Sequence, residues 1–384
     1  AVNQGGIDFY NRVIDYCLKQ GVEPNVTLFH YDLPEAIAKE GGWENRAIVD
    51  AFAEYARVCF TAFGDRVKLW VTINEPKYYA YCSHMVGNYP PNHRHDFNRY
   101  FTTVYHEAVA SAKAVAIYHS LKLNGSIGIV HDSSNVEVAP DTKEKERVHM
   151  IADLFYNRII LDTACKGEFP GALISLLREY GIDTSYIKFE DMLVFLQGKV
   201  DFLGLNVYNR FYITDYSAGE TEVFHNNKGA GSNAKEGIRI RDWYETAIDP
   251  NTKRNLWGRE IYPKCMYNTL MEIKERYGDI PVYITENGHG CYEKPNDEGY
   301  VEDDERIEMM QGYIDYMLKA MEDGCNVRGY YAWSTMDLYS WVNGYEKRYG
   351  LVRVDFDDHN RRYPKKSYYW FKKLIEDYRK AEEE

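Results

Sequence analysis

Residues 282–288 read VYITENG, a short apolar and β-branched run that begins after Pro281 and ends in Asn287 and Gly288. This pattern predicts a buried parallel strand followed by a sharp turn. The turn leaves Glu286 at the carboxyl end of the strand, where burial of a carboxylate costs several kcal/mol unless other groups compensate. A glutamate in this position therefore calls for a functional reason.

A second stretch of the chain has the same form. Residues 68–76 read KLWVTINEP, which is an apolar strand, then Asn74 and Glu75, then Pro76. Proline cannot continue the hydrogen-bond ladder, so the strand is expected to end there. Two glutamates at the ends of two apolar strands indicate chemistry that uses a pair of carboxylates.

The rest of the chain alternates between helical and strand patterns. Helices are predicted at residues 5–20, 47–63, 100–121 and 367–379, and strands at 22–30, 67–74, 126–131, 200–206, 280–286 and 327–334. Such alternation predicts an α/β fold with a parallel sheet covered by helices. A doubly wound nucleotide fold would show a glycine-rich loop after its first strand, which is missing here. A (β/α)8 TIM barrel fits better, with about six of its eight units present and the other two expected before Ala1.

We expect residues 1–384 to form a single (β/α) barrel catalytic domain. Residues 219–249 are polar, and we interpret them as a long surface insertion after a strand end, where such loops shape the rim of a barrel site. The acidic run at residues 302–305 is interpreted as a solvated face and the start of a helix.

Composition narrows the class of protein. With 45% hydrophobic residues the 384-residue chain can bury one large core, and its 15% aromatic content suits sugar stacking and core packing alike. Lys and Arg number 46 against 59 Asp and Glu, so the formal charge is -13, and no long basic run appears. Nucleic acid and anionic membranes are therefore poor partners.

The seven cysteines are scattered without CxxC or zinc-type spacing. Their odd number argues against a disulfide framework and favours a reduced, cytoplasmic protein. No signal peptide and no apolar run of membrane length is visible in the sequence. Because the chain opens at Ala1 directly into a helical pattern, we expect an amino-terminal portion to precede it.

In a barrel, the carboxyl ends of all strands share one face, so Glu75, Glu286, His30, Asn206 and Trp333 should converge. Retaining glycosidases use two carboxyl groups about 5 to 5.5 Å apart, one as nucleophile and one as acid and base. Each residue taken alone also fits a structural role: a buried glutamate in an ion pair, a core histidine, a packed tryptophan, a turn asparagine. Their combination favours a catalytic site.

At these residues the chain resembles glycoside hydrolase family 1, the retaining β-glycosidases. The segment TINEP at residues 72–76 matches the family's acid/base motif, and ITENG at 284–288 matches its nucleophile motif. The likeness continues through FHYDLP at 29–34, LGLNVY at 203–208 and AWSTMD at 332–337, and it covers essentially the whole chain.

The resemblance implies roles for individual residues. It makes Glu286 the nucleophile and Glu75 the acid/base, and Tyr208 would orient the nucleophile. The sugar-binding residues that it implies are His30, Asn74, Asn206 and Trp333. Family members begin about two strands earlier, and those strands carry a glutamine and an arginine of the site that cannot be assigned here. A barrel without them is expected to leave open sheet edges and an uncovered core, so the chain alone would be unstable or unable to close.

Residues 337–350, DLYSWVNGYEKRYG, bear on the substrate. Where ordinary β-glucosidases of the family carry a glutamate that grips sugar hydroxyls, this sequence has Ser340. Ser340, Lys347 and Tyr349 match the phosphate pocket of the 6-phospho-β-glycosidases, and together they offer three donors to a 6-phosphate of charge about -1.5 to -2. The tryptophan at position 341 favours the 6-phospho-β-galactosidase branch or an enzyme that accepts both sugars. The alternative is that Lys347 and Arg348 are ordinary surface cations and that Ser340 is a polar loop residue.

The sequence thus favours retaining hydrolysis of 6-phosphorylated β-galactosides or β-glucosides, with a phosphorylated disaccharide or aryl glycoside as the partner and with no metal or organic cofactor. A β-glycosidase for neutral sugars and an inactive sugar-binding fragment remain open, as does a homo-oligomer. A metal-dependent hydrolase is disfavoured because His93 and His95 form the only HxH, in a proline-rich loop and not at a strand end.

Overall fold

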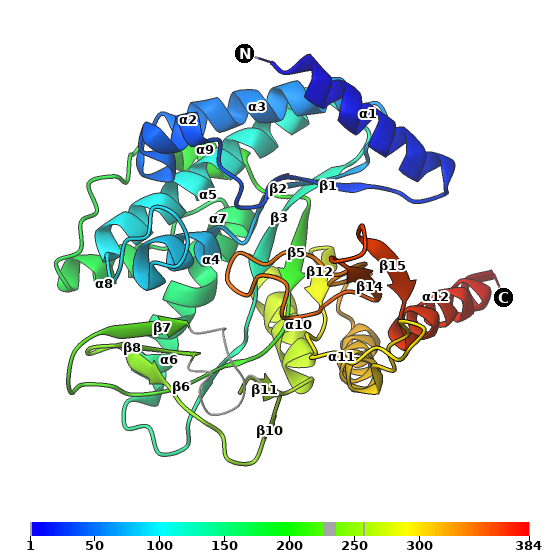
Figure 1. The fold of residues 1–384 in the computed structure, drawn as a ribbon. Helices are drawn as coiled ribbons and strands as arrows, with labels where there is room; N and C mark the ends of the chain where they lie inside the picture. Colours follow the sequence, from blue (N-terminus) through cyan, green and yellow to red (C-terminus); the bar gives the residue numbers. More distant parts are fainter. Residues whose placement is uncertain (1, 226–235, 256–257, 384) are drawn as a thin grey trace.

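The computed structural model describes residues 2–225, 236–255 and 258–383. Its centre is a curled six-stranded parallel sheet with strand order β1-β2-β3-β5-β12-β13 (Figure 1). The strands are β1 Asn25–Phe29, β2 Leu69–Asn74, β3 Ser126–Asp132, β5 Phe202–Asn206, β12 Val282–Asn287 and β13 Val327–Ala332. All six predicted strands are confirmed, each within about three residues of its expected ends.

The sheet is six strands of a (β/α)8 barrel, as predicted. Among the described residues, β1 and β13 each pair on one side only, so the expected open edges are present. The helix preceding β1, α1 (Gln4–Lys19), also exposes apolar side chains, among them Tyr10 and Tyr16 at 57% and 66%. Long apolar side chains this accessible mark a face that is not covered in this chain.

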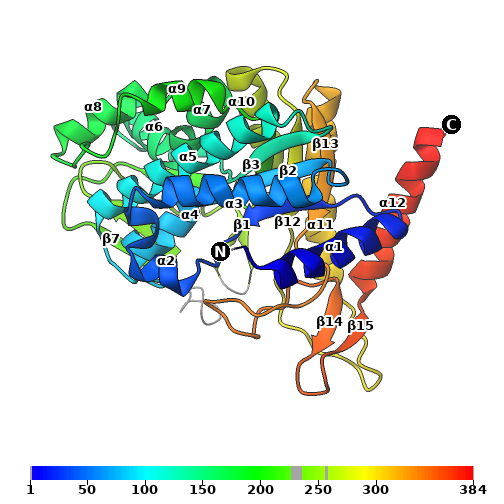
Figure 2. The ribbon, with the colours of Figure 1, turned by 90° about the horizontal axis from the view of Figure 1, so that it is seen from above.

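Helices follow most strands and cover the outer face of the sheet (Figure 2). The remaining α-helices are α2 Glu35–Lys39, α3 Ile48–Phe63, α4 Pro76–Ala80, α5 Phe97–Ser120, α6 Lys145–Asp153, α7 Ile159–Lys166, α8 Gly171–Glu179, α9 Asp191–Gln197, α10 Lys264–Tyr277, α11 Asp304–Glu322 and α12 Lys366–Glu383. Three short helices complete the set: η1 Gly42–Glu44, η2 Tyr81–Val86 and η3 Leu154–Arg158. The four predicted helices correspond to α1, α3, α5 and α12.

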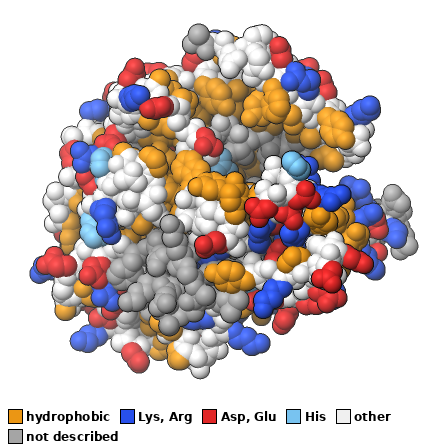
Figure 3. Space-filling view, viewed as in Figure 1, with side chains coloured by type: hydrophobic (Ala, Val, Ile, Leu, Met, Phe, Trp, Pro, Cys, Tyr) orange, Lys and Arg blue, Asp and Glu red, His pale blue; other side chains and the backbone are white. Residues whose placement is uncertain are grey.

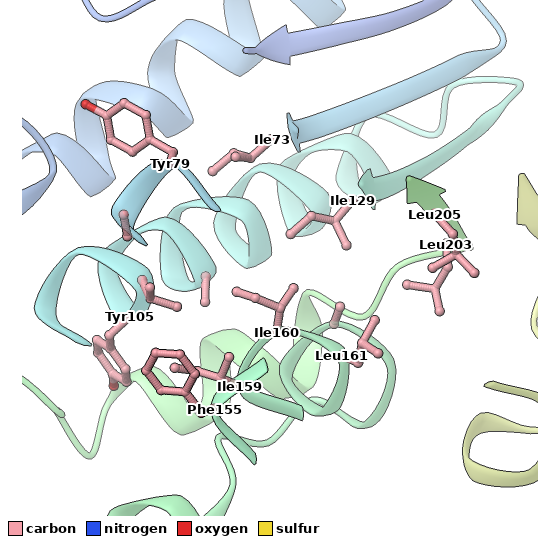
Figure 4. Packing of buried hydrophobic residues seen from close by; sticks show 14 of the residues in the cluster. Ile73, Tyr79, Tyr105, Ile129, Phe155, Ile159, Ile160, Leu161, Leu203 and Leu205 are labelled. Carbon is pink, nitrogen blue, oxygen red and sulfur yellow. The ribbon is translucent and has the colours of Figure 1, made fainter. Parts of the chain in front are cut away.

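The main core lies between the sheet and this helical layer (Figure 4). Ile73 and Ile129 point from β2 and β3 towards the helices, where Ile160 of α7 is fully buried. Complete burial of such an aliphatic side chain contributes about 1.5 to 3 kcal/mol. The core therefore fixes the strands, and with them the positions of the residues at the strand ends.

The interpretation of residues 219–249 as a surface insertion is wrong in part. It contributes three strands to a second, five-stranded sheet of order β4-β6-β9-β8-β7. The five strands of this sheet are β4 Val136–Val138, β6 Phe211–Thr214, β9 Tyr244–Thr246, β8 Glu236–Ile240 and β7 Glu222–His225. Two further sheets have two strands each: β10 Lys253–Arg254 with β11 Glu260–Ile261, and β14 Val352–Asp355 with β15 Arg361–Pro364. Trp243 and Tyr244 are buried because they pack on Phe155. Residues 226–235 of the insertion lie outside the described residues.

The acidic run at 302–305 does start a helix, since α11 begins at Asp304. The expectation of a solvated face is wrong for Asp303, which is 5% exposed. Its carboxylate accepts hydrogen bonds from the guanidinium of Arg306 and, at 2.6 Å, from the hydroxyl of Ser367. Arg306 is itself completely buried, and a buried cation needs an anionic partner.

Surface features agree with the composition. On the face shown in Figure 3, acidic and basic side chains are interspersed and no single large basic patch appears. All seven cysteines lie at described positions, and none of them forms a disulfide. Within the described ranges, no helix has the length and apolarity that crossing a membrane requires.

Candidate active site

A cavity of about 350 Å³ opens at the carboxyl ends of the parallel strands. Ten of the eleven predicted site residues line it: His30, Glu75, Asn206, Tyr208, Glu286, Trp333, Ser340, Trp341, Lys347 and Tyr349. The eleventh, Asn74, is buried and reaches the site through hydrogen bonds to His30 and Asn206. The predicted convergence of strand ends is therefore seen in the structure.

Glu75 directly follows β2 and has a left-handed backbone, with φ of 47°. Pro76 then opens α4 at a position where proline's missing N–H costs nothing. The carboxylate of Glu75 accepts a hydrogen bond from Asn206 Nδ2 at 2.7 Å, and its other oxygen accepts one from the Tyr31 hydroxyl. Sequence reasoning did not single out Tyr31, although it lies next to His30, just beyond the end of β1.

Glu286 lies near the end of β12, where the pairing with both neighbouring strands shifts register. Such irregularities redirect side chains at the ends of strands. The hydroxyl of Tyr208 donates to Glu286 Oε2 at 2.8 Å. The backbone of Tyr208 is held in place in turn, because its carbonyl oxygen accepts a hydrogen bond from the hydroxyl of Tyr313.

The pKa of Glu286 is raised well above its usual value, first by burial and then by the negative charge of Glu75. Hydrogen bonds from Tyr208 and Asn206 act in the opposite direction without cancelling the rise. Two buried carboxylates facing one cavity cannot both ionise without mutual repulsion. The negative charge of Glu75 therefore disfavours ionisation of Glu286.

Asn206 connects the two glutamate-bearing strands. Its Oδ1 accepts a hydrogen bond from Thr285 Oγ1 at 2.7 Å, which turns its NH2 group towards Glu75 and Asn74. The amide orientation is thus fixed by partners on both sides. Asn206 can hold the carboxylate of Glu75 in one position.

His30 and Trp333 form the floor beside the carboxylates. Their rings stack with centroids 6.0 Å apart, and His30 Nε2 lies 3.3 Å from Asn74 Nδ2. Burial lowers the pKa of His30 and outweighs the opposite effects of Glu75 and Asp32. The imidazole is therefore neutral at pH 7, with one donor and one acceptor nitrogen.

An aromatic wall closes one side of the cavity. Trp341 packs against Tyr89 and Tyr31, with ring centroids 5.0 and 6.3 Å apart. Tyr89 also lines the cavity and was missed because it lies in the proline-rich loop after η2. Aromatic faces of this kind suit the apolar face of a sugar ring.

Ser340, Lys347 and Tyr349 come from one loop between β13 and β14. Ser340 and Gly344 exchange two backbone hydrogen bonds, at 2.9 and 2.8 Å, which fold the loop back on itself. Lys347 is only 5% exposed, so the alternative of an ordinary surface cation is wrong. A second cation, Arg259, lines the same cavity and was not foreseen.

A buried ion pair lies behind Glu75. The ammonium of Lys77 is 2.5 Å from Asp132 Oδ2 and 3.2 Å from the centroid of the Tyr156 ring. Burial raises the pKa of Asp132 to about 7 despite the opposing charge of Lys77. Neither residue was predicted from the sequence, because a lysine after a proline turn gives no sign of burial.

Two carboxylates and an aromatic wall at the carboxyl edge of a (β/α) barrel sheet are typical of glycoside hydrolases. The chain matches glycosyl hydrolase family 1 over residues 1–380, and it belongs to that family.

Three relatives are similar to the chain over nearly its whole length. The 6-phospho-beta-galactosidase of Clostridium acetobutylicum is 38% identical over 379 residues, covering 97% of this chain and 79% of that protein. The 6-phospho-beta-glucosidase GmuD of Bacillus subtilis is 36% identical over 381 residues, with 98% and 78% covered. Beta-glucosidase A of Thermotoga maritima is 36% identical over 375 residues, with 97% and 78% covered.

Solved structures show the same fold. A family 1 β-glucosidase from Thermotoga maritima superposes with a TM-score of 0.85 at 34% identity, covering 98% of this chain and 79% of that one. The complex of a β-glucosidase from the same organism with deoxynojirimycin gives a TM-score of 0.83 at 34% identity, with 98% and 78% covered.

Proposed function

We propose that this glycoside hydrolase cleaves 6-phosphorylated β-glycosides with retention of configuration, as a single catalytic domain acting in the cytoplasm. The observation that carries the proposal is the buried side chain of Lys347 in the wall of the cavity that also contains Glu75 and Glu286. A lysine ammonium that lines a substrate cavity can form charge-assisted hydrogen bonds to an anionic group of the ligand. The lack of disulfides among the seven cysteines agrees with a reducing compartment.

The proposed reaction has two displacements. In the first, a carboxylate oxygen of Glu286 attacks the anomeric carbon while Glu75 gives its proton to the departing glycosidic oxygen. In the second, Glu75 removes a proton from water, the water oxygen attacks the anomeric carbon, and the bond to Glu286 breaks. The negative charge of Glu75 raises the pKa of Glu286, so a proton on Glu75 favours the ionised nucleophile that the first displacement needs.

The phosphate would lie at the outer end of the sugar, within reach of Ser340, Lys347 and Tyr349. Lys347 supplies a full positive charge, and the two hydroxyls supply neutral donors. Arg259 lines the same cavity and adds a second positive charge. A phosphate of charge about -1.5 to -2 would thus be balanced locally, although the whole chain carries -13.

The names of two of the relatives, a 6-phospho-beta-galactosidase and a 6-phospho-beta-glucosidase, support this choice of substrate. Trp341, in contact with Tyr89, leads us to favour galacto or dual specificity. The likeness to beta-glucosidase A keeps hydrolysis of neutral β-glucosides as a second candidate. Ser340 disfavours this second candidate, because the β-glucosidases of the family carry a glutamate at that position.

Replacing Lys347 by alanine should separate phosphate binding from general support of the cavity. A charge-assisted hydrogen bond contributes about 1.5 to 3 kcal/mol, so kcat/KM for 6-phosphoglycosides should fall about 10- to 150-fold. The value for neutral glycosides should change little. Steady-state rates on nitrophenyl glycosides with and without the 6-phosphate measure both quantities.

Two further variants serve as controls for this prediction. Lys347→Arg keeps the charge and should retain more of the phosphoglycoside activity, whereas Lys372→Ala on the exposed surface of α12 should leave both rates unchanged. Ser340→Glu places a negative charge against the phosphate and should lower the ratio of the two efficiencies further. Equal losses on both substrates in Lys347→Ala would mean that the loop only supports the wall.

A further inference from the structure

Three side chains outside the substrate cavity lie close together, and one of them comes from the loop that also carries Tyr89. They are Glu44 at the end of η1, His84 in η2, and His93 in the loop between η2 and α5. One possible ligand atom from each lies within 4.8 Å of the other two. None of the three lines the substrate cavity.

We propose that Glu44, His84 and His93 bind a divalent transition-metal ion that fastens this loop to the barrel. Such a site would be structural, and it would be the same whichever sugar the enzyme cleaves. Two imidazoles and a carboxylate form a donor set suited to zinc and its neighbours in the first transition row.

The distances agree with one shared ion. His84 Nδ1 and His93 Nδ1 are 3.2 Å apart, and His93 Nδ1 and Glu44 Oε1 are 3.6 Å apart. Ligands bound tetrahedrally to zinc at about 2.0 to 2.1 Å would lie roughly 3.3 Å from one another. Two ring nitrogens facing each other at 3.2 Å also need a proton or a cation between their lone pairs.

Neighbouring groups orient the ligands in the way that metal sites require. Thr103 Oγ1 lies 2.9 Å from His84 Nε2, so a hydrogen bond from Nε2–H leaves the Nδ1 lone pair towards the proposed ion. Arg99 Nε holds Glu44 Oε2 at 2.8 Å and leaves Oε1 for the ion. The charge of Arg99 is itself balanced by Asp96 at 2.5 Å.

The three side chains differ in their exposure to solvent. The side chain of His84 is buried, whereas those of Glu44 and His93 are 27% and 33% exposed. An ion can therefore enter from solvent and complete its coordination with water. By joining η1 to the loop, it would limit the movement of Tyr89, which forms part of the substrate wall.

The test is a titration of the full, tag-free chain with Zn²⁺ after treatment with a chelator and its removal. We expect one equivalent to bind with a rise in Tm, since binding to the folded state alone adds stability. His93→Ala and Glu44→Gln should each weaken binding by at least about 10-fold and abolish the rise in Tm. Both side chains are partly exposed, so these variants should fold where His84→Ala could fail.

Two variants control for other sites. His119→Ala removes an exposed histidine that pairs with Asp201 and should bind Zn²⁺ as the unmodified chain does. Cys291→Ser removes the thiol of a second potential group, His289, Cys291 and Glu305, and should also leave binding unchanged. The Co²⁺ form should lack the intense thiolate charge-transfer band that cysteine ligation would give.

Two outcomes would overturn the proposal. One is the absence of stoichiometric Zn²⁺ binding in the unmodified chain, which would mean that only a proton lies between His84 and His93. The other is binding that survives His93→Ala but is lost in Cys291→Ser, which would place the ion at the second group.

Discussion

Replacement of Glu286 by alanine is expected to lower kcat/KM on aryl 6-phosphoglycosides by about 10⁴-fold or more, as loss of a nucleophile does in other hydrolases. Added azide should restore part of the activity, because the small anion can occupy the place of the missing carboxylate and attack the anomeric carbon from that side. The product should be the glycosyl azide of inverted configuration, identified by NMR.

The isosteric variant Glu286→Gln distinguishes lost chemistry from lost folding. Because the folded state raises the pKa of Glu286, the ionised carboxylate lowers the free energy of unfolding at pH 7, and this cost grows as the pH rises above the usual glutamate range. Glu286→Gln should therefore be inactive with a Tm that is equal or higher. A sharp drop in Tm would attribute the lost activity to misfolding.

Replacement of Glu75 by alanine should have an effect that depends on the leaving group. Dinitrophenyl leaving groups need little protonation, so the first displacement should survive with them, whereas unactivated disaccharides should lose several orders of magnitude in kcat/KM. Azide should then act on the covalent intermediate and give a product of retained configuration. Swapped product stereochemistry between the Glu75 and Glu286 variants would reverse the assignment.

The pH profile of Glu75→Gln adds an independent check on the coupling between the two carboxyl groups. Glu286 acts in its ionised form, so activity is lost as the pH falls through its pKa. Removing the charge of Glu75 removes the second-largest cause that raises this pKa. With an activated substrate, the acidic limb of the pH profile of kcat/KM should therefore move to lower pH.

Much of the fold could be predicted because strand and helix patterns alternate and each strand is a short apolar run. The strand at 282–287 illustrates this, since its β-branched residues and terminal Asn287 define both its path and its end. The second sheet was missed because its strands are short and three of them lie in the polar segment at residues 219–249. In β8, Ile238 and Ile240 alternate with Arg239, but only tertiary packing shows that the two isoleucines are buried.

The predicted site residues converge because a parallel sheet brings all of its strand ends to one edge. Residues that act through loops or through buried pairs could not be found in the same way. Arg259 reaches the cavity from outside the central sheet, and the burial of Lys77 depends on Asp132 and Tyr156, which are distant in sequence. Tyr31 is an exception, since its position beside His30, just beyond the end of β1, was a usable signal.

The most direct test of the central claim is the ratio of kcat/KM for a nitrophenyl β-glycoside 6-phosphate to that for the matching neutral glycoside, measured on the unmodified chain with both galacto and gluco sugars. The buried Lys347 beside Ser340 and Tyr349 predicts that the phosphorylated substrate is preferred by at least about 10-fold, the lower bound for one charge-assisted contact. Preference for the neutral glycoside, or turnover of neither, would contradict the account.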